Sequence, residues 1–158
     1  MSDVSPLDLE GIRIAIEQAR KSYSEGGIPI GGALIASPSQ KILGSGHNQR
    51  IQKASPILHG ETAALEDAGR LQADVYRHAT MFTTLSPCSM CTGAILLYKI
   101  PRVVIGENET FMGEENLLRS RGVEVVVLNN QECKDLMKKF IEEKPEEWLE
   151  DIGEPASK

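Results

Sequence analysis

Apolar and polar residues alternate along this chain with two different periods, which predict helices and strands in turn. Residues 7–24 carry Ile12, Ile16 and Ala19 at the spacing of a helix buried on one side, and Gly26-Gly27 ends that pattern. Further helices are predicted over residues 60–68, 88–98, 113–120 and 131–143, with a last short helix beginning at Pro145. The short apolar runs predict strands at 32–37, 41–46, 80–85, 102–106 and 123–128, whereas the polar segment 48–58 is typical of a loop.

The order of these elements predicts an α/β protein. From residue 80 onward strands and helices alternate, and the later strands are continuously apolar, as expected where helices cover both faces of a sheet. Pro38-Ser39 turns the chain between the first two strands, which predicts one antiparallel hairpin. We therefore expect a three-layer α/β/α sandwich around a mixed, mostly parallel sheet of about five strands. The length suits a single domain spanning residues 1–158, with 152–158 as a partly frayed tail.

The composition is ordinary for a soluble globular protein, with 41% apolar and 25% charged residues. The formal net charge of −6 argues against a nucleic-acid ligand, because binding to phosphates draws on basic surface, and leaves a small neutral substrate open. No apolar run approaches the roughly 18 residues of a membrane span, and the acidic N-terminus lacks the apolar core of a signal peptide. With only three cysteines, we expect a cytoplasmic protein, although the composition does not separate cytosol from nucleus.

The stretch 86-SPCSMC-91 is the first that indicates chemistry. Cys88 and Cys91 are three residues apart at the start of a predicted helix, where residues i and i+3 share a face, so both sulfur atoms can reach one ion. The amides of a helix N-terminus also favour the thiolate, which is the form that binds metal. Two thiolates alone make a poor zinc site, so a third ligand is needed.

The stretch 58-LHGETAALEDAG-69 offers that ligand together with a carboxylate. His59 would start the helix after the hairpin, and neighbouring helices of a three-layer fold can point their N-termini into one crevice at the strand ends. His59, Cys88 and Cys91 would leave the fourth tetrahedral position to water, which is the catalytic type of zinc site. Glu61 does not share the helical face of His59, so it suits proton transfer better than metal binding.

The combination of H-x-E with P-C-x-x-C is the signature of zinc-dependent nucleobase and nucleoside deaminases. The chain resembles the fungal cytosine deaminases from about residue 10 to residue 154, through 26-GGIPIGG-32, 46-GHN-48, 58-LHGE-61, 83-TTLSPCSMCTG-93, 106-GEN-108 and 148-WLEDIGE-154. The resemblance implies a homodimeric enzyme of the cytidine deaminase-like fold with one zinc ion per subunit. Its reaction would be the hydrolysis of free cytosine to uracil and ammonia in pyrimidine salvage, with 5-substituted cytosine analogues as further substrates.

The resemblance also implies the roles of individual residues. It makes Glu61 the proton shuttle and makes three residues the zinc ligands, namely His59, Cys88 and Cys91. Four residues would hydrogen-bond the base: the amide of Asn48 at one edge, the N–H of Gly60 at the ring carbonyl, the carbonyl of Ser86 at the exocyclic amine, and Asp151 at the ring N–H region. Asn and Asp offer the two polarities that reading a pyrimidine edge requires.

Phe111 and Trp148 would close the pocket over the base, because aromatic rings stack on its flat face. The C-terminal segment would thereby form a lid suited to a small ligand without a ribose. Leu149 follows Trp148 where an aromatic residue would fit the family pattern, a departure that concerns the packing of the lid and leaves the chemistry untouched.

Other interpretations of the same residues stay open at this point. Cys88 and Cys91 also fit a redox pair, or a closed structural zinc site with Cys133 as fourth ligand, but neither explains the H-x-E upstream. A deaminase of the same fold acting on tRNA adenosine, guanine or a nucleoside is the main alternative function. A zinc-stabilised module without catalysis is a further one, and Glu61 counts against it because a structural zinc site needs no spare carboxylate.

Overall fold

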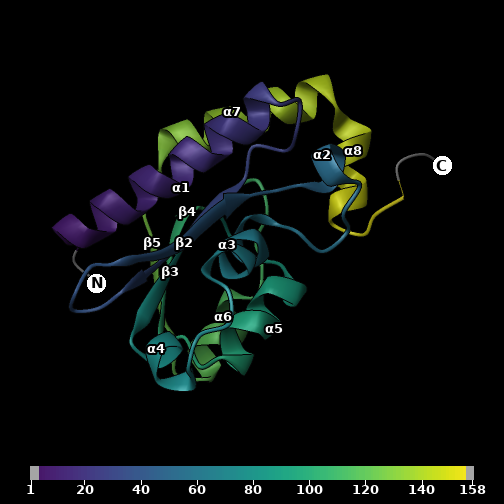
Figure 1. Ribbon diagram of the computed structural model, residues 1–158. Helices are drawn as coiled ribbons and strands as arrows, with labels where there is room; N and C mark the ends of the chain where they lie inside the picture. Colours follow the sequence, from purple (N-terminus) through teal and green to yellow (C-terminus); the bar gives the residue numbers. More distant parts are fainter. Residues whose placement is uncertain (1–3, 156–158) are drawn as a thin grey trace.

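The computed structural model describes residues 4–155, and its elements follow the predicted order (Figure 1). The five strands are β1 (Gly31–Ala36), β2 (Ile42–His47), β3 (Ala79–Leu85), β4 (Arg102–Glu107) and β5 (Glu124–Val127). The helices are α1 (Pro6–Ser24), α2 (Arg50–Lys53), α3 (Gly60–Ala68), α4 (Ala73–Arg77), α5 (Ser89–Leu97), α6 (Glu115–Ser120), α7 (Gln131–Glu143) and α8 (Pro145–Asp151). The short helices α2 and α4 were not predicted, because one turn is too short to show a helical period.

The strands form one mixed sheet in the order β2-β1-β3-β4-β5. Strand β1 is antiparallel to both β2 and β3, whereas β3, β4 and β5 are parallel, so two of the four pairings are of each kind. The predicted hairpin is confirmed, with Gly32 opposite Gly46 in its register. The sheet is therefore mixed, as expected, although less dominated by parallel pairs than the sequence suggested.

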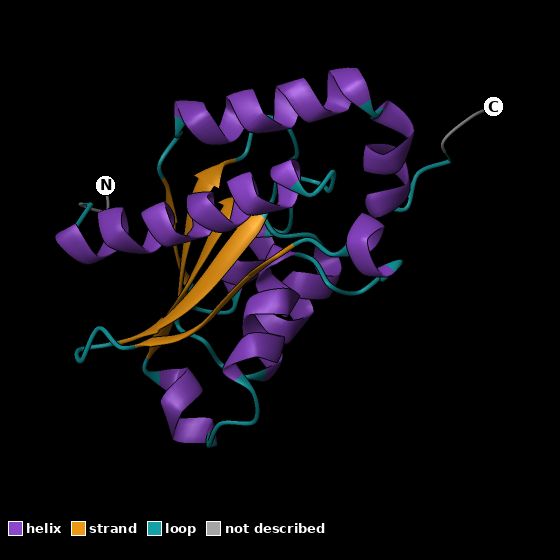
Figure 2. Ribbon diagram, turned by 45° about the horizontal axis from the view of Figure 1, so that its top comes forward, coloured by secondary structure: helices purple, strands orange, loops and turns teal. Residues whose placement is uncertain are grey.

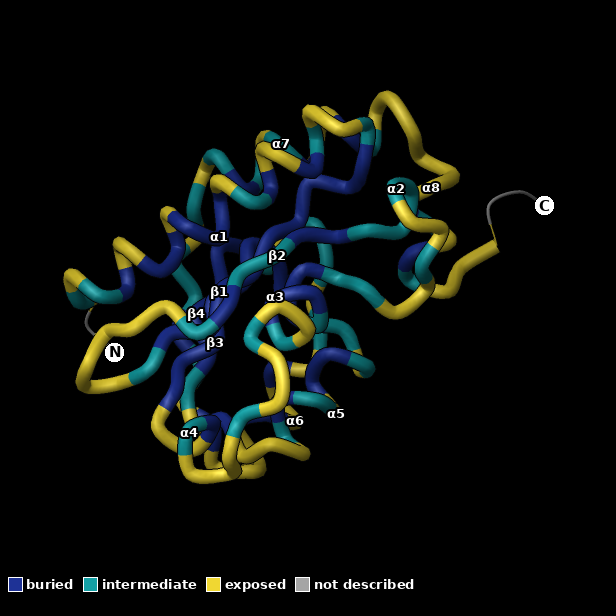
Figure 3. The backbone as a smooth tube through the Cα atoms, in the orientation of Figure 1, coloured by how far each residue is buried: buried dark blue, intermediate teal, exposed yellow. Residues whose placement is uncertain are grey.

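Helices cover both faces of the sheet, which confirms the three-layer α/β/α architecture (Figure 2). Helices α1 and α7 lie on one face, where Ile12, Phe82 and Cys133 share an apolar core. Helices α3, α5 and α6 lie on the other face over a second core that includes Leu34 and Ile95. The three central strands, β1, β3 and β4, are almost entirely buried between these layers, whereas the edge strands β2 and β5 are partly exposed (Figure 3). Among the described residues, no helix is both long and apolar enough to cross a membrane.

The first turn of α3 is held against the start of β1 by a contact that only glycine permits. A Cβ on Gly32 would lie 2.6 Å from the carbonyl oxygen of Gly60, and a Cβ on Gly60 would lie 2.9 Å from the carbonyl carbon of Gly31. Gly32 is paired in turn with Thr83, close to the end of β3. The N-terminus of α3 therefore lies beside the point where β3 ends and the chain leads into α5.

The C-terminal segment follows the last turn of α8. The N–H groups of Gly153 and Glu154 donate to the carbonyls of Glu150 and Leu149, at 3.1 and 2.8 Å. We expected fraying over residues 152–158, and of these residues 156–158 lie outside the described part of the chain.

The close approach of α3 to β1 leads to a first prediction. Gly32→Ala should lower the free energy of unfolding by about 1–3 kcal/mol, because the added methyl group overlaps backbone atoms that have no room to relax. The same overlap should push His59 and Glu61 away from the end of β3, so metal content should fall as well. Thermal unfolding and metal analysis of the purified variant test this, and a fully metallated variant as stable as the parent would contradict it.

Candidate active site

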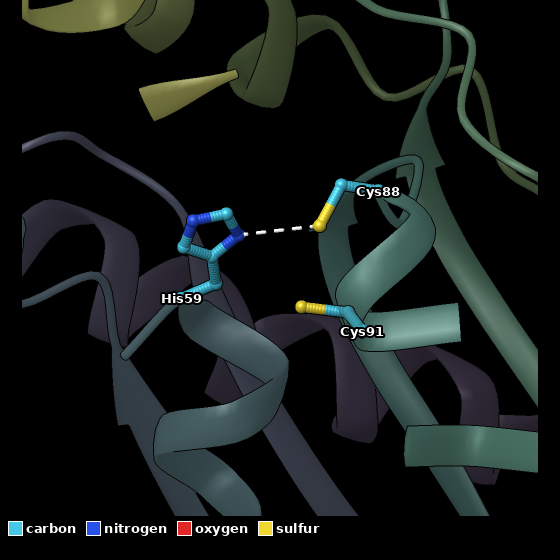
Figure 4. Close-up of side chains that lie close together, drawn as sticks. All are labelled: His59, Cys88 and Cys91. Atoms are coloured by element: carbon cyan, nitrogen blue, oxygen red, sulfur yellow. Dashed lines mark hydrogen bonds between the residues drawn. The ribbon is translucent and has the colours of Figure 1, made fainter. Parts of the chain in front are cut away.

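Two helix N-termini meet at the end of β3 and bring three metal-ligating side chains together (Figure 4). His59 is the N-cap of α3, Cys88 is the N-cap of α5, and Cys91 lies in the first turn of α5. One ligand atom from each residue lies within 4.8 Å of the others, and Nδ1 of His59 is 3.4 Å from Sγ of Cys88. The backbone of His59 is fixed because its N–H donates to Oγ1 of Thr62 at 2.8 Å.

The three side chains fit a zinc ion. Zinc–sulfur bonds of about 2.3 Å and zinc–nitrogen bonds of about 2.0 Å in a tetrahedron place neighbouring ligand atoms about 3.5–3.8 Å apart. The separation of 3.4 Å between Nδ1 of His59 and Sγ of Cys88 agrees with that requirement. A set of one histidine and two cysteines is moreover a known donor set of catalytic zinc sites.

The two thiols differ in their readiness to lose a proton. A hydrogen bond from Cys91, helped by His59, lowers the pKa of Cys88 to about 4 against the opposing effect of burial. The hydrogen bond to Cys88 and its own burial raise the pKa of Cys91 well above the usual value. Cys88 is thus a thiolate at neutral pH, and a metal ion would have to displace the proton of Cys91 as it binds.

The two ring nitrogens of His59 face different partners. Nδ1 faces Cys88, while Nε2 lies 3.3 Å from Oδ1 of Asp151. Burial disfavours the charged ring, but Asp151 and Cys88 outweigh that effect and raise the pKa of His59 to about 10. The arrangement is typical of a metal-ligating histidine, whose second nitrogen faces a carboxylate that orients the ring.

Glu61 is a buried carboxylate close to this cluster. Its exposed fraction is only 4%. Burial, and then the negative charge of Cys88, raises the pKa of Glu61 to about 7, although the charge on His59 opposes the shift. A carboxyl group with a pKa near neutrality can both accept and donate a proton at physiological pH, which is the property that a proton shuttle requires.

A small cavity opens onto the cluster, and its walls come from distant parts of the chain. It is lined by Ile30, His59, Glu61, Leu85, Ser86, Cys88, Phe111, Trp148, Asp151 and Ile152. The rings of Phe111 and Trp148 pack edge to face, with their centroids 6.2 Å apart, and close one side of the cavity. The free space of about 20 Å³ holds little more than a water molecule, so a planar base has to displace some of these walls to enter.

The polar end of the cavity is formed by Asp151, which α8 brings back to the start of α2. The amide of Asn48 donates to Oδ2 of Asp151 at 3.0 Å, and Oδ1 of Asn48 accepts from the N–H of Arg50 at 2.9 Å. Both Asn48 and Asp151 are buried. Oδ1 of Asp151 has no well-aligned hydrogen-bond donor among the residues that the structure describes, although Nε2 of His59 lies 3.3 Å and Nη1 of Arg50 3.9 Å from it.

The structure places most of the predicted site residues around this cavity. Ser86, Phe111, Trp148 and Asp151 line it, whereas Asn48 stands behind Asp151 and Gly60 forms the first turn of α3 beside Gly32. The other two histidines, His47 and His78, lie outside the metal-ligating cluster. Three apolar wall residues were missed in the sequence, Ile30, Leu85 and Ile152, because buried aliphatic residues carry no distinctive signal.

Comparison with known proteins identifies the family. The model of the cytidine and deoxycytidylate deaminase zinc-binding region matches residues 6–107. The cytosine deaminase of Candida albicans is 64% identical over 147 residues, which are 93% of this chain and 97% of that protein. The tRNA-specific adenosine deaminase of Haemophilus influenzae is 37% identical over 66% of this chain and 61% of its own length.

Solved structures agree with the fold. The guanine deaminase of Nitrosomonas europaea superimposes with a TM-score of 0.68 over 89% of this chain and 86% of that one, and at 20% identity this likeness establishes the fold alone. The sequence match, the fold and the cluster of His59, Cys88 and Cys91 all agree with a zinc-binding deaminase. The chain therefore belongs to the cytidine and deoxycytidylate deaminase family and carries its zinc-binding region.

Proposed function

We propose that this protein is a zinc-dependent cytosine deaminase that hydrolyses free cytosine to uracil and ammonia. The observation that carries the choice of substrate is the buried Oδ1 of Asp151 at the wall of the cavity, whose polar neighbours are Nε2 of His59 at 3.3 Å and Nη1 of Arg50 at 3.9 Å. Neither neighbour is aligned for a good hydrogen bond, so this buried oxygen can still accept an N–H group from a ligand. The relative from Candida albicans, whose name states this activity, supports the same conclusion.

The position of Asp151 also favours a free base over a nucleoside. Free cytosine carries an N–H group at N1, whereas in cytidine the ribose occupies that nitrogen and removes the donor. A site that hydrogen-bonds a ligand group strongly rejects analogues that lack it, because its own polar atoms are then left unpaired. Trp148 and Phe111 close one side of the cavity, so a sugar would require the walls to move further than the free base does.

His59, Cys88 and Cys91 would hold the zinc ion, which when bound lowers the pKa of water and so makes a nucleophile available at neutral pH. Hydrolysis adds the oxygen of water to C4 of the base and breaks the bond from C4 to the exocyclic nitrogen. The two protons of that water end on N3 of the ring and on the departing amine. Glu61, with its pKa near 7, is the group that carries them.

The remaining residues orient the base for that transfer. We assign the Ser86 carbonyl to the exocyclic amine, the Gly60 N–H to the ring carbonyl, and Asn48 to the base edge beside Asp151. Asn48 already donates to Asp151, so this hydrogen bond fixes the carboxylate that lines the cavity. Phe111 and Trp148 would pack on the face of the ring.

The 37% identity to a tRNA-specific adenosine deaminase favours a second candidate, deamination of adenosine in tRNA. A net charge of −6 and the closure of the cavity by α8 speak against it, since tRNA requires basic surface and an open path to the site. Guanine or a nucleoside is larger than cytosine and would require a larger displacement of the cavity walls.

We further propose that the chain is one domain that acts as a homodimer in the cytoplasm, in pyrimidine salvage. Exposed apolar side chains of α5 and α6 support the dimer, since Leu97 is 69%, Tyr98 44% and Leu117 37% exposed. The ends of these two helices lie side by side, with Leu96 and Arg121 around one hollow. The reducing cytoplasm would keep the free thiols of the zinc site available as ligands.

A panel of substrates tests the proposed reaction. We expect release of ammonia from cytosine and its 5-substituted analogues, and a kcat/KM at least about a hundredfold lower for cytidine, CMP, adenine, guanine and tRNA. Cytidine and CMP lack the N1–H group that Asp151 would accept, and the purines and tRNA are larger, so that the walls of the cavity would have to move further. A strong chelator should abolish the activity and zinc should restore it. Stoichiometric zinc without deamination of any base would contradict the proposal and favour a non-catalytic module.

Glu61→Gln should reduce kcat at least about a thousandfold while zinc stays bound, because the amide keeps the shape of the side chain but cannot carry a proton. Steady-state kinetics and metal analysis of the same preparation separate the two effects. Glu66→Gln, on the same helix and outside the wall of the cavity, serves as the matched control and should leave kcat unchanged. Full activity of Glu61→Gln would exclude the proposed proton transfer.

Leu97→Lys should shift the protein from dimer to monomer, because a charge would then have to be buried in an apolar interface. Sedimentation velocity measures this shift directly. Leu9→Lys provides the control, since Leu9 is 61% exposed but belongs to α1 on the opposite face of the sheet. A dimer unaffected by Leu97→Lys would place the interface elsewhere.

A further inference from the structure

Behind Ser86 lies a buried carboxylate to which none of the proposed roles has yet been assigned. Glu115, the first residue of α6, is 3% exposed. Its Oε2 accepts a hydrogen bond from Oγ of Ser86 at 2.7 Å, and its Oε1 accepts one from the amide of Asn108 at 3.3 Å. Glu115 is remote from Ser86 in sequence and lies outside the wall of the cavity.

The carboxylate fixes the direction of these hydrogen bonds. An ionised carboxylate can only accept, so the Ser86 hydroxyl has to donate its proton to Glu115. Oγ of Ser86 then uses a lone pair to accept from the N–H of Gly113, at 2.9 Å. Hydrogen bonds to a charged acceptor are stronger than those between neutral groups, so Ser86 is held in one orientation.

The main chain of Ser86 is held from the other side. Its N–H donates to the carbonyl of Glu107 at 3.0 Å, across the pairing of β3 with β4. Gly113 packs so closely on the following residue that a Cβ would overlap the carbonyl oxygen of Pro87. The peptide that carries the Ser86 carbonyl is therefore clamped between β4, the segment before α6, and Glu115.

We propose that Glu115 is a positioning residue for deamination, which acts through the Ser86 hydroxyl to aim the Ser86 carbonyl at the exocyclic amine of the base. This inference rests on the proposed function, because the amine contact of Ser86 is part of it. Glu115 does not touch the substrate. Within residues 4–155, Arg119 is its one ion-pair partner, with Nη1 3.7 Å away on a side chain that is 49% exposed.

A carbonyl aimed in this way distinguishes substrate from product. The amine of cytosine donates to it, whereas uracil presents a carbonyl oxygen at the same position, and two acceptors repel each other. A loosened Ser86 carbonyl weakens the contact with cytosine and at the same time relieves the repulsion of uracil. The ratio of the inhibition constant of uracil to the KM of cytosine therefore reports on this carbonyl specifically.

Glu115→Gln is the test, because glutamine keeps the volume but replaces one acceptor with a donor that faces the donors of Ser86 or Asn108. We expect kcat/KM for cytosine to fall about tenfold and the uracil-to-cytosine ratio to shrink by a similar factor, with zinc content unchanged. Glu114→Gln is the matched control, since it removes the same charge from the same end of α6 on an exposed side chain. It should change both quantities by less than about twofold.

Ser86→Ala gives a second route to the same answer, including the case in which Glu115→Gln fails to fold. It removes the hydroxyl through which Glu115 acts, so this substitution should by itself shrink the ratio of the uracil inhibition constant to the cytosine KM. Combining it with Glu115→Gln should not lower the ratio further. A Glu115→Gln protein that melts at a lower temperature with an unchanged ratio would show a purely structural role and overturn the inference. Loss of cytosine turnover in the parent protein would instead contradict the proposed function.

Discussion

The site depends on the contact between two main-chain segments that carry no side chains. Gly60 approaches Gly31 and Gly32 so closely that neither side tolerates a Cβ, and this brings the first turn of α3 to the edge of the sheet where β3 ends. Cys88 and Cys91 arrive at the same place because β3 leads directly into α5. The three metal-ligating side chains are thus positioned by backbone packing before any metal binds, and a preformed set of ligands loses little conformational freedom on binding.

The electrostatics of the pocket follow from that convergence. Cys88, Glu61 and Asp151 place acidic groups around His59 in a poorly solvated space, where the helix N-termini, the His59 ring and the more distant Arg50 oppose their charge. Such a surplus of buried negative charge is stable only with a cation nearby. A bound zinc ion would supply that positive charge. The same burial raises the pKa of Glu61 to about 7, which suits the proposed proton transfer.

The sequence predicted the parts of the site that depend on local spacing. Helix α3 begins and ends where its pattern indicated, and the offset of two between His59 and Glu61 already separated a ligand from a carboxylate. Contacts between residues distant in the chain could not be read in this way. Glu115 and Arg50 meet Ser86 and Asp151 only in the folded chain, and in the sequence each is one charged residue among many. The roles of Trp148 and Asp151 were accessible only through the resemblance to a family.

Helix α8 shows why the sequence pattern did not indicate the proposed roles of Trp148 and Asp151. Seven residues are too few for a helix that is stable by itself, so the place of α8 is set by its contacts: Trp148 against Phe111, and Asp151 with Asn48. These same side chains are the ones that a base would meet in the cavity. Closing the pocket and recognising the ligand are therefore not separate tasks, because the hydrogen bond that fastens α8 also orients the carboxylate that, in the proposed function, selects the free base. In the sequence α8 is only a short segment, and neither its closure of the pocket nor its contact with Asn48 is evident until the chain is folded.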